Sequence, residues 1–126
     1  MTKKIIIAVG DLKVKALLND SQTAKEIYDK LPLESRVNTW GEEIYFNIPV
    51  MVDLEKAFAK EVVGLGDLGY WPQGPAFCIF FGQTPVSKPG EIRPATAVNV
   101  IGKITGDPKV FKKIKGRETI TVQKEP

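Results

Sequence analysis

The sequence predicts a mainly β protein, a small β-barrel or sandwich of about eight strands with two peripheral helices. Short apolar or alternating segments recur along the chain, and turns rich in Gly, Pro and Asp separate them. Two segments have helical spacing or helix-start signals, and no internal repeat is found. A length of 126 residues fits one domain, residues 1–126.

The chain opens with a predicted hairpin followed by a helix. Residues 5–9 are apolar, Gly10-Asp11 is a two-residue turn signal, and residues 12–16 alternate apolar side chains with lysine. Asp20 or Ser21 can cap the helix, which Pro32 ends. The apolar residues of this helix recur at helical spacing, so the helix should cover one face of a sheet.

A second hairpin joins residues 33–40 to residues 43–48 through Gly41-Glu42, because glycine at the first loop position suits a type II′ turn. The register then gives three opposite pairs: Trp40 and Glu43, Asn38 and Tyr45, Arg36 and Asn47. Side chains alternate between the two faces of a strand, so these six share one face. Two aromatic rings among hydrogen-bonding groups suit a recognition surface, although a solvent-facing sheet remains the alternative.

The rest of the chain predicts further strands and a short second helix. Residues 49–65 are ambiguous, with a short helix at 54–60 and an edge strand at 61–65 as one interpretation. The other predictions are a central strand at 76–81, a loop at 83–95, strands at 96–105 and 117–124, and a helix at 107–114 that begins at Asp107-Pro108.

Composition excludes several kinds of chemistry. The chain has no histidine, so Ser-His, Cys-His and His-based zinc sites are excluded, and we expect no metal and no cofactor. Cys78 is the only cysteine and lies in an apolar run, as a small buried residue would. No apolar stretch approaches the ~20 residues of a membrane span and no secretory signal is seen, so we expect a cytoplasmic protein. A surface rich in Lys and Glu would suit a thermophile.

The net charge of +3 comes from basic residues spread along the chain. The densest group surrounds the end of the second predicted helix: Lys109, Lys112, Lys113, Lys115 and Arg117. A solvated helix end explains such a group, because cations are favoured there by the helix dipole. Contact with nucleic acid or another polyanion is a minor alternative, and no nucleic-acid recognition motif is visible.

Three segments carry a family resemblance: NTWGEEIYFNIPV, GDLGYWPQGPAFCIFFGQTP and AVNVIGKITGDPKVFKKI. Together they resemble a family of small prokaryotic proteins with an atypical cyclophilin fold and no established function. GPAFCIFF is similar to the paired-Phe motif of peptidyl-prolyl isomerases, and VIGKITGDPKVFKKI to the strand and helix that follow it. The resemblance implies a closed cyclophilin-like β-barrel.

The chain departs from the isomerases at the positions that carry their activity. Those enzymes use an arginine in an FHR-type motif, beside a QGGD segment, to polarise the prolyl amide. No arginine occurs here between Arg36 and Arg93, and both motifs are missing. The X-Pro rotation barrier is near ~20 kcal/mol, so an isomerase needs a positioned donor. Conventional isomerase activity is therefore not expected.

The leading functional hypothesis is a pocket lined by aromatics at one barrel face, which binds a small molecule or peptide. Its candidate residues come from the second hairpin, from a bend predicted at residues 64–75 by their many glycines and prolines, and from a later strand: Arg36, Asn38, Trp40, Glu43, Tyr45, Tyr70, Trp71 and Asn99. Alternatively, one or both rings of the bend plug a barrel end, and Asn99 makes a structural hydrogen bond within its strand.

A second hypothesis is an enzyme of unknown reaction, a hydrolase or residual isomerase, that uses Glu43 or Asp67 as a general base. Asp67 has an alternative role, since in GDLG its carboxylate can bond to its own turn. Loss of turnover on changing Glu43 to glutamine would favour the enzyme.

Overall fold

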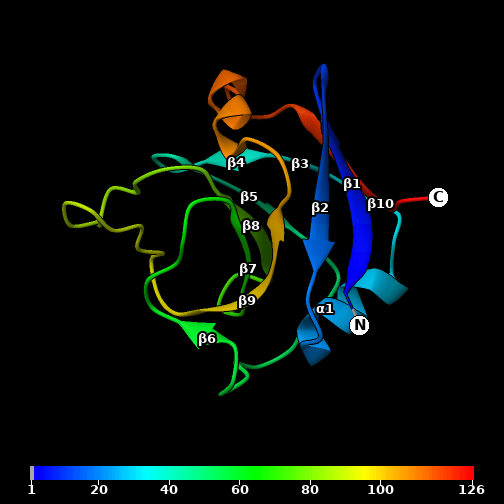
Figure 1. Ribbon diagram of the computed structural model, residues 1–126, viewed down its shortest axis with the longest axis horizontal. Helices are drawn as coiled ribbons and strands as arrows, with labels where there is room; N and C mark the ends of the chain where they lie inside the picture. Colours follow the sequence, from blue (N-terminus) through cyan, green and yellow to red (C-terminus); the bar gives the residue numbers. More distant parts are fainter. Residues whose placement is uncertain (1) are drawn as a thin grey trace.

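The computed structural model describes residues 2–126, which form one sheet of ten strands, one α-helix and one 3-10 helix. The strands are β1 Lys3–Val9, β2 Leu12–Leu18, β3 Leu33–Arg36, β4 Asn38–Thr39, β5 Glu43–Asn47, β6 Ala59–Lys60, β7 Asp67–Trp71, β8 Ala76–Phe80, β9 Val98–Ile104 and β10 Thr119–Lys124. The helices are α1 Gln22–Asp29 and η1 Pro108–Lys113. Figure 1 shows the strands curving around a common centre, with η1 and α1 at opposite ends.

The order of the strands closes the sheet into a nearly complete antiparallel barrel. That order is β3-β10-β1-β2-β9-β7-β8-β5-β4, and β6 pairs with β9 beside this path. β3 and β4 stand at the two ends of the order, yet Val37 alone separates them along the chain. The two ends of the sheet must therefore lie next to each other, so that the sheet nearly closes on itself. The predicted mainly β barrel is confirmed.

The prediction of one continuous strand from Leu33 to Trp40 is wrong, because the chain changes its partner at Val37. Asn38 pairs with Tyr45 in β5 as predicted, whereas Arg36 pairs with Thr119 in β10. The Val37 N–H donates to the Glu118 carbonyl at 3.0 Å, and the Val37 carbonyl accepts from the Arg117 N–H at 2.7 Å. Closure of the barrel requires this change, since the same segment serves both edges of the sheet.

The turn of the second hairpin forms as the sequence predicts. Gly41 has φ +59, which is the region that a glycine at the first position of a type II′ turn adopts. Trp40 and Glu43 exchange two backbone hydrogen bonds, of 2.9 and 3.2 Å, across the turn. Trp40 is thereby fixed beside the first residue of β5.

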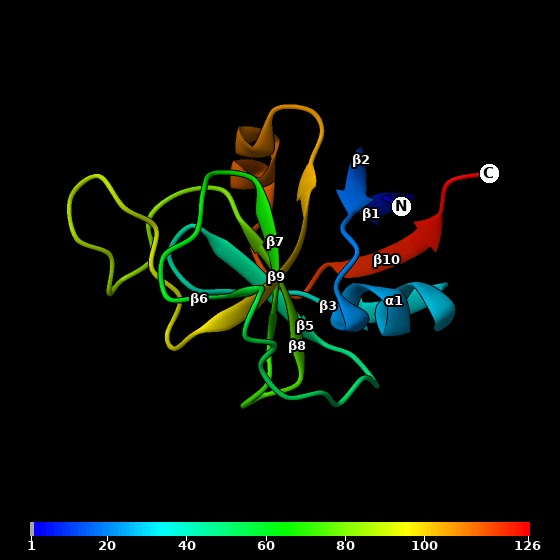
Figure 2. The same ribbon diagram turned by 60° about the horizontal axis from the view of Figure 1, so that its bottom comes forward.

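Both helices begin at the predicted caps. The Ser21 hydroxyl accepts from the Ala24 N–H at 3.0 Å at the start of α1, and the Asp107 carboxylate accepts from the Lys109 N–H at 3.0 Å at the start of η1. As predicted, α1 covers the sheet with its apolar residues: Ala24 and Ile27 are buried in the core and the helix contacts β2 and β9. Figure 2 shows α1 at one side of the molecule, below β10. The short helix predicted at 54–60 is not formed: the chain makes one turn, in which the Phe58 and Ala59 N–H groups donate to the Glu55 carbonyl, and then pairs with β9 at Ala59–Lys60.

The sheet packs apolar side chains on both faces where β5, β8, β7 and β9 lie together. The inward face of β8 gives Phe77 and Ile79 to the main core, which fills the barrel. Its other face carries Ala76, Cys78 and Phe80, which belong to a second, smaller cluster. Strand β8 is therefore buried on both faces, as predicted for residues 76–81.

The second cluster is covered by the long connection from β8 to β9, residues 81–97. Within this connection Ile92 packs against the cluster, and its carbonyl accepts from the Val63 N–H at 2.9 Å. The connection projects to the left in Figures 1 and 2, where it is drawn in yellow-green. The predicted loop at 83–95 thus forms a layer over the outer face of the barrel.

Candidate functional site

A cavity of about 210 Å³ lies on this outer face, between the sheet and the connection of residues 81–97. Its walls come from the second hairpin, from β7, β8 and β9, and from the end of the connection: Trp40, Glu43, Tyr45, Trp71, Cys78, Pro94, Ala95 and Val98. We refer to it below as the aromatic cavity, because three of these side chains carry large rings. It is smaller than the ~300–1,000 Å³ of pockets for drug-sized ligands, so it suits a small molecule or a single side chain.

Strand register brings the polar and aromatic walls together. Glu43 and Tyr45 lie two residues apart on β5 and share one face, while Tyr45 is paired with Cys78 on the neighbouring β8. The Gly41 turn adds Trp40 beside Glu43. Trp71 is the last residue of β7 and pairs with Ala76 of β8. Because β8 lies between β5 and β7, the Trp71 indole borders the cavity on the side opposite Glu43 and Tyr45.

The indole of Trp71 is held in one orientation. Its Nε1–H donates to the Thr96 hydroxyl at 2.6 Å, which joins the ring to the covering connection. A Cβ atom on Gly74 would lie 2.7 Å from this ring, so the position requires glycine. The Trp71 wall is therefore pre-formed by its own turn and by Thr96.

Glu43 is the carboxyl group of the cavity, and it is only 6% exposed. Burial raises the pKa of Glu43 from 4.5 to about 7, since an ionised carboxylate loses its hydration there. A hydrogen bond with the Cys78 thiol acts in the opposite direction and is the smaller effect. In the described part of the chain, no Lys or Arg forms an ion pair with Glu43.

Cys78 is a buried thiol rather than a nucleophile. Burial raises its pKa well above the usual value, and the negative charge of Glu43 raises it further. The thiolate is the reactive form of cysteine, so a thiol in this environment stays inert. This agrees with the sequence-based interpretation of Cys78 as a small apolar residue.

Four of the eight candidate residues meet at the aromatic cavity: Trp40, Glu43, Tyr45 and Trp71. Tyr70 does not, because residues 67–71 form a strand and not the predicted bend. Consecutive residues of a strand point to opposite faces, so Tyr70 enters the barrel while Trp71 leaves it. The buried Tyr70 hydroxyl donates to the Val50 carbonyl at 2.6 Å and accepts from the Val52 N–H.

Asn99 is a structural residue at the end of the barrel and does not border the cavity. Its side chain is fully buried, and its Oδ1 accepts from the Glu55 N–H at 2.7 Å. Its Nδ2 donates to the Thr23 hydroxyl and to the Asp53 carbonyl, both at 3.0 Å. The amide therefore joins β9 to α1 and to the segment before β6. The sequence suggested a structural hydrogen bond within the strand as the alternative role, whereas these bonds reach other segments.

The other polar candidates also lie outside the cavity. Arg36 is exposed on β3, where its guanidinium donates to the Arg117 carbonyl at 3.2 Å, and the change of partner at Val37 separates it from β5. Asn38 is exposed and lines no wall of the cavity, although it keeps its predicted pairing with Tyr45. Asp67 accepts from the Gly64 N–H at 2.7 Å and so closes its own turn.

Sequence reasoning missed the walls that come from the covering connection and from β9. Pro94 and Ala95 lie within a segment predicted only as a loop, and Val98 was one apolar residue of a predicted strand. No local pattern shows that this loop folds back over the sheet. For Cys78, the available signal was strand alternation: if Phe77 points into the barrel, the next residue, Cys78, points outward.

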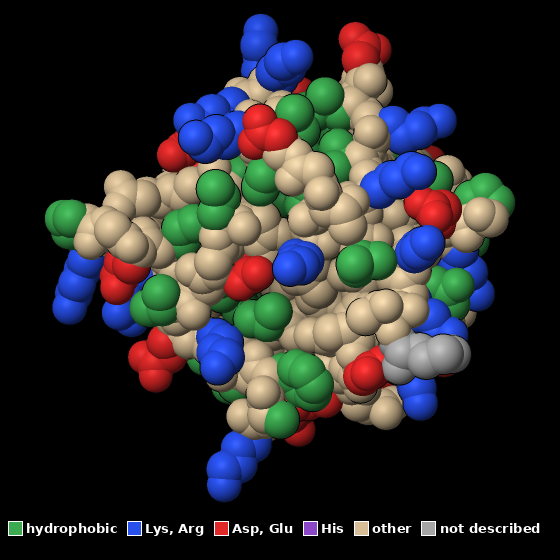
Figure 3. Space-filling model, viewed as in Figure 1, with side chains coloured by type: hydrophobic (Ala, Val, Ile, Leu, Met, Phe, Trp, Pro, Cys, Tyr) green, Lys and Arg blue, Asp and Glu red, His purple; other side chains and the backbone are tan. Residues whose placement is uncertain are grey.

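Within residues 2–126, no three side chains of metal-binding types gather at one place. No helix in the same residues combines the length and the apolar character needed to cross a membrane. Figure 3 shows the Lys and Arg side chains of one face spread among other residues, without a continuous basic stripe.

Comparison with known proteins adds the family. The family model described as cyclophilin-like matches residues 3–123, almost the whole chain. The chain belongs to the cyclophilin-like family. Within this family's fold, a hypothetical protein from the archaeon Archaeoglobus fulgidus, known from a solution structure, is 38% identical, with a TM-score of 0.81 over 98% of this chain and 95% of that one.

A more distant structural neighbour is McbB, whose structure is known in complex with tryptophan. It has a TM-score of 0.70 and 13% identity, over 96% of this chain and 44% of that chain, and at this identity it supports the fold alone. No curated protein sequence matches the chain. The predicted resemblance to a cyclophilin-like family without an established function is therefore confirmed.

Proposed function

We propose that this cyclophilin-like protein binds a small molecule, or one side chain of a peptide, in the aromatic cavity. The observation that supports this most directly is the composition of the walls, where three aromatic side chains surround one buried carboxyl group. Apolar rings provide contact area and a single polar group fixes orientation, which is the usual design of a small-molecule site.

Two further observations support ligand binding. The Trp71 ring is held by its hydrogen bond to Thr96 and packs directly on the backbone of Gly74. Little side-chain entropy is therefore lost when a ligand packs on this ring. In addition, the structural neighbour McbB, whose chain this protein matches over 44% of its length, is known in complex with tryptophan. The identity of the ligand does not follow from that neighbour.

Intrinsic fluorescence tests the proposal directly, because Trp40 and Trp71 are the only tryptophans and both border the cavity. We would titrate the protein with three phenyl compounds of similar size: phenethylamine, 2-phenylethanol and phenylacetate. Saturable quenching or a shift of the emission maximum by at least one of them is the expected result.

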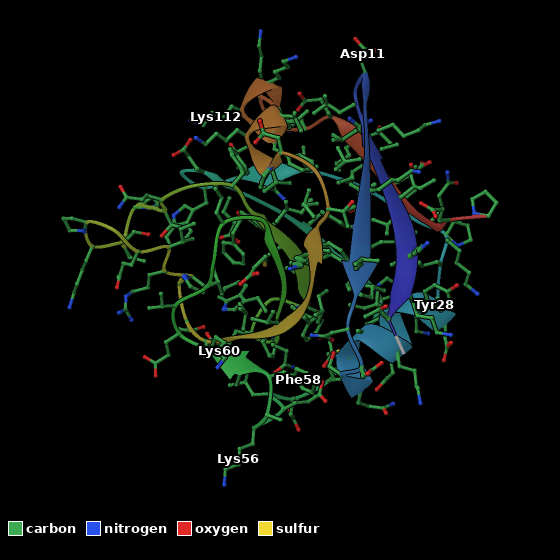
Figure 4. All side chains as sticks on the ribbon, viewed as in Figure 1. Asp11, Tyr28, Lys56, Phe58, Lys60 and Lys112 are labelled. Carbon is green, nitrogen blue, oxygen red and sulfur yellow. The ribbon has the colours of Figure 1, made fainter. Side chains whose placement is uncertain are left out.

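A matched pair of variants locates the binding. Tyr45→Ala removes a wall of the cavity and should weaken binding at least tenfold. Tyr28→Ala removes a tyrosine of similar exposure on α1, on the side of the molecule opposite the covering connection (Figure 4), and should leave binding unchanged. Equal affinities in the two variants, or no saturable binding of any compound, would contradict the proposal.

A second candidate function is general acid-base catalysis by Glu43. The supporting observation is the pKa of about 7, which lets one carboxyl group accept or donate a proton near neutral pH. An activity screen over small amides, esters and carbonyl compounds should then reveal turnover that Glu43→Gln abolishes. Saturable binding of a compound without any turnover would favour the binding function instead.

Conventional prolyl isomerisation is not part of the proposal. The chain has three arginines, Arg36, Arg93 and Arg117, and none borders the aromatic cavity. Arg93, which lies on the covering connection, is held by Glu91 at 2.8 Å and by Glu61 at 3.9 Å. The cavity therefore offers a proline no guanidinium to polarise its amide.

A further inference from the structure

The aromatic cavity has an uneven balance of charge. Among its described walls, Glu43 is the one carboxyl group, and the walls include no Lys or Arg. An anionic ligand would meet a carboxyl group, and no cation would compensate its charge. A cationic ligand would instead supply the positive charge that the ionised Glu43 carboxylate lacks in the free protein.

The remaining walls favour the same sign of ligand charge. The faces of indole and phenol rings carry negative electrostatic potential and attract cations, and the attraction is stronger where water is excluded. Trp40, Tyr45 and Trp71 supply two indoles and one phenol around the buried carboxyl group. The apolar body of an amine can pack on these rings while its nitrogen approaches Glu43.

We propose that the ligand of the aromatic cavity is a small organic cation, an amine whose ammonium group pairs with the Glu43 carboxylate while its apolar body lies among Trp40, Tyr45 and Trp71. This inference rests on the proposed binding function and specifies the class of ligand. The ammonium supplies N–H donors to the carboxylate oxygens, and this charged hydrogen bond forms where water is scarce.

The titratable groups around Glu43 are few, so its ionisation can follow the ligand. Cys78 faces it from β8, and Tyr45 lies on the same face of β5. The covering connection faces the cavity with Pro94 and Ala95, which carry no charge, and β7 and β9 face it with Trp71 and Val98. Arg93 of the connection is already paired with Glu91 and Glu61.

Binding of a cation should therefore release a proton. With a pKa of about 7, Glu43 is protonated in about half of the free molecules at pH 7, and the proton leaves to solvent when the ammonium binds. The apparent affinity should be near its limit at pH 8. At pH 5 it should be weaker by a factor on the order of 100, since about one molecule in a hundred then has an ionised Glu43.

The three phenyl compounds are similar in size and differ in charge, so they test the effect of ligand charge alone. Phenethylamine is a cation at both pH values, 2-phenylethanol is its neutral counterpart, and phenylacetate is an anion of similar size. By tryptophan fluorescence at pH 8, phenethylamine should bind at least tenfold more tightly than 2-phenylethanol, and phenylacetate should bind most weakly. From pH 8 to pH 5 the affinity for phenethylamine should fall by a factor on the order of 100, and that for 2-phenylethanol should change little.

Two neighbouring carboxyl groups provide the variant and its control. Glu43→Gln keeps the shape of the side chain and should reduce the affinity for phenethylamine to that for 2-phenylethanol, without pH dependence. Glu42→Gln changes the adjacent carboxylate, which pairs with Lys112 at 3.4 Å and does not border the cavity, and should leave the affinity unchanged. Circular dichroism of both variants would confirm that each is folded.

The outcomes distinguish this inference from the function on which it rests. Equal or tighter binding of 2-phenylethanol or phenylacetate at pH 8, with loss of binding in Tyr45→Ala, would overturn the ligand class and leave the binding function standing. An equal effect of Glu42→Gln and Glu43→Gln would also overturn it. Failure of all three compounds to bind would contradict both proposals.

Discussion

Replacing Glu43 with glutamine should stabilise the protein, although Glu43 is buried and polar. The pKa of this carboxyl group is about 7 in the folded chain against an ordinary value of 4.5, and burial is the main cause. Between pH 4.5 and pH 7, the Glu43 carboxyl group loses its proton in the unfolded chain and keeps it in the folded chain. The folded state then binds more protons than the unfolded state, so the free energy of unfolding falls as the pH rises.

The size of the effect follows from the two pKa values. A difference from 4.5 to about 7, at ~1.4 kcal/mol per pH unit, corresponds to a loss of about 3 kcal/mol in the free energy of unfolding above pH 7. Glutamine has the same shape and no charge to desolvate, so it avoids this loss. Below pH 4.5 the carboxyl group is neutral in both states, and the two proteins should be about equally stable.

Urea denaturation of the wild-type protein and of Glu43→Gln, at intervals from pH 4 to pH 8, would measure the difference. We expect it to be near zero at pH 4, to rise between pH 4.5 and pH 7, and to level off above pH 7. Glu91→Gln is the matched control, because Arg93 lowers the pKa of Glu91 and the same substitution should not stabilise the protein at pH 8. A difference curve for Glu43→Gln that is flat or of opposite sign would refute the reasoning.

Three other predictions concern the structure around the cavity. Asn99→Ala leaves the partly buried Glu55 N–H without its acceptor and should cost about 1–3 kcal/mol in urea denaturation, whereas a neutral effect would contradict the structural role of the amide. Cys78 should resist a thiol reagent at pH 7.5 in the folded protein and react fully in urea, and rapid labelling of the native chain would show that the thiol is accessible. Gly102→Ala should cost about 3 kcal/mol or more, because its Cβ would lie 1.9 Å from the Leu17 carbonyl oxygen, and a stable variant would mean that β2 and β9 can move apart.

Local features of the fold could be predicted because they depend on neighbouring residues. The Gly41 turn, the Ser21 cap and the Asp107 cap each involve groups within three residues of one another, and all three form as predicted. The family resemblance also gave the correct barrel, as the match over residues 3–123 confirms. These features needed no knowledge of distant contacts.

The candidate site was predicted in part, and its errors have two causes. Tyr70 was misplaced because glycine and proline around it indicated a bend, whereas the alternation of β7 separates it from Trp71. Arg36 was misplaced because its strand leaves β5 at Val37 to pair with β10. That exchange depends on residues more than eighty positions away, which no local pattern can reveal.

The sequence by itself determined the class of the fold and the absence of histidine chemistry, and it placed Trp40, Glu43 and Tyr45 on one flank of a hairpin. Only the tertiary structure decided that this flank is roofed by residues 81–97 and that Glu43 is buried without a cation. The reason is physical: strand alternation and turn geometry act over a few residues, whereas hydration of a carboxyl group depends on every segment packed around it. The same residues on an open sheet would form a wet surface, and the covering connection makes them a cavity.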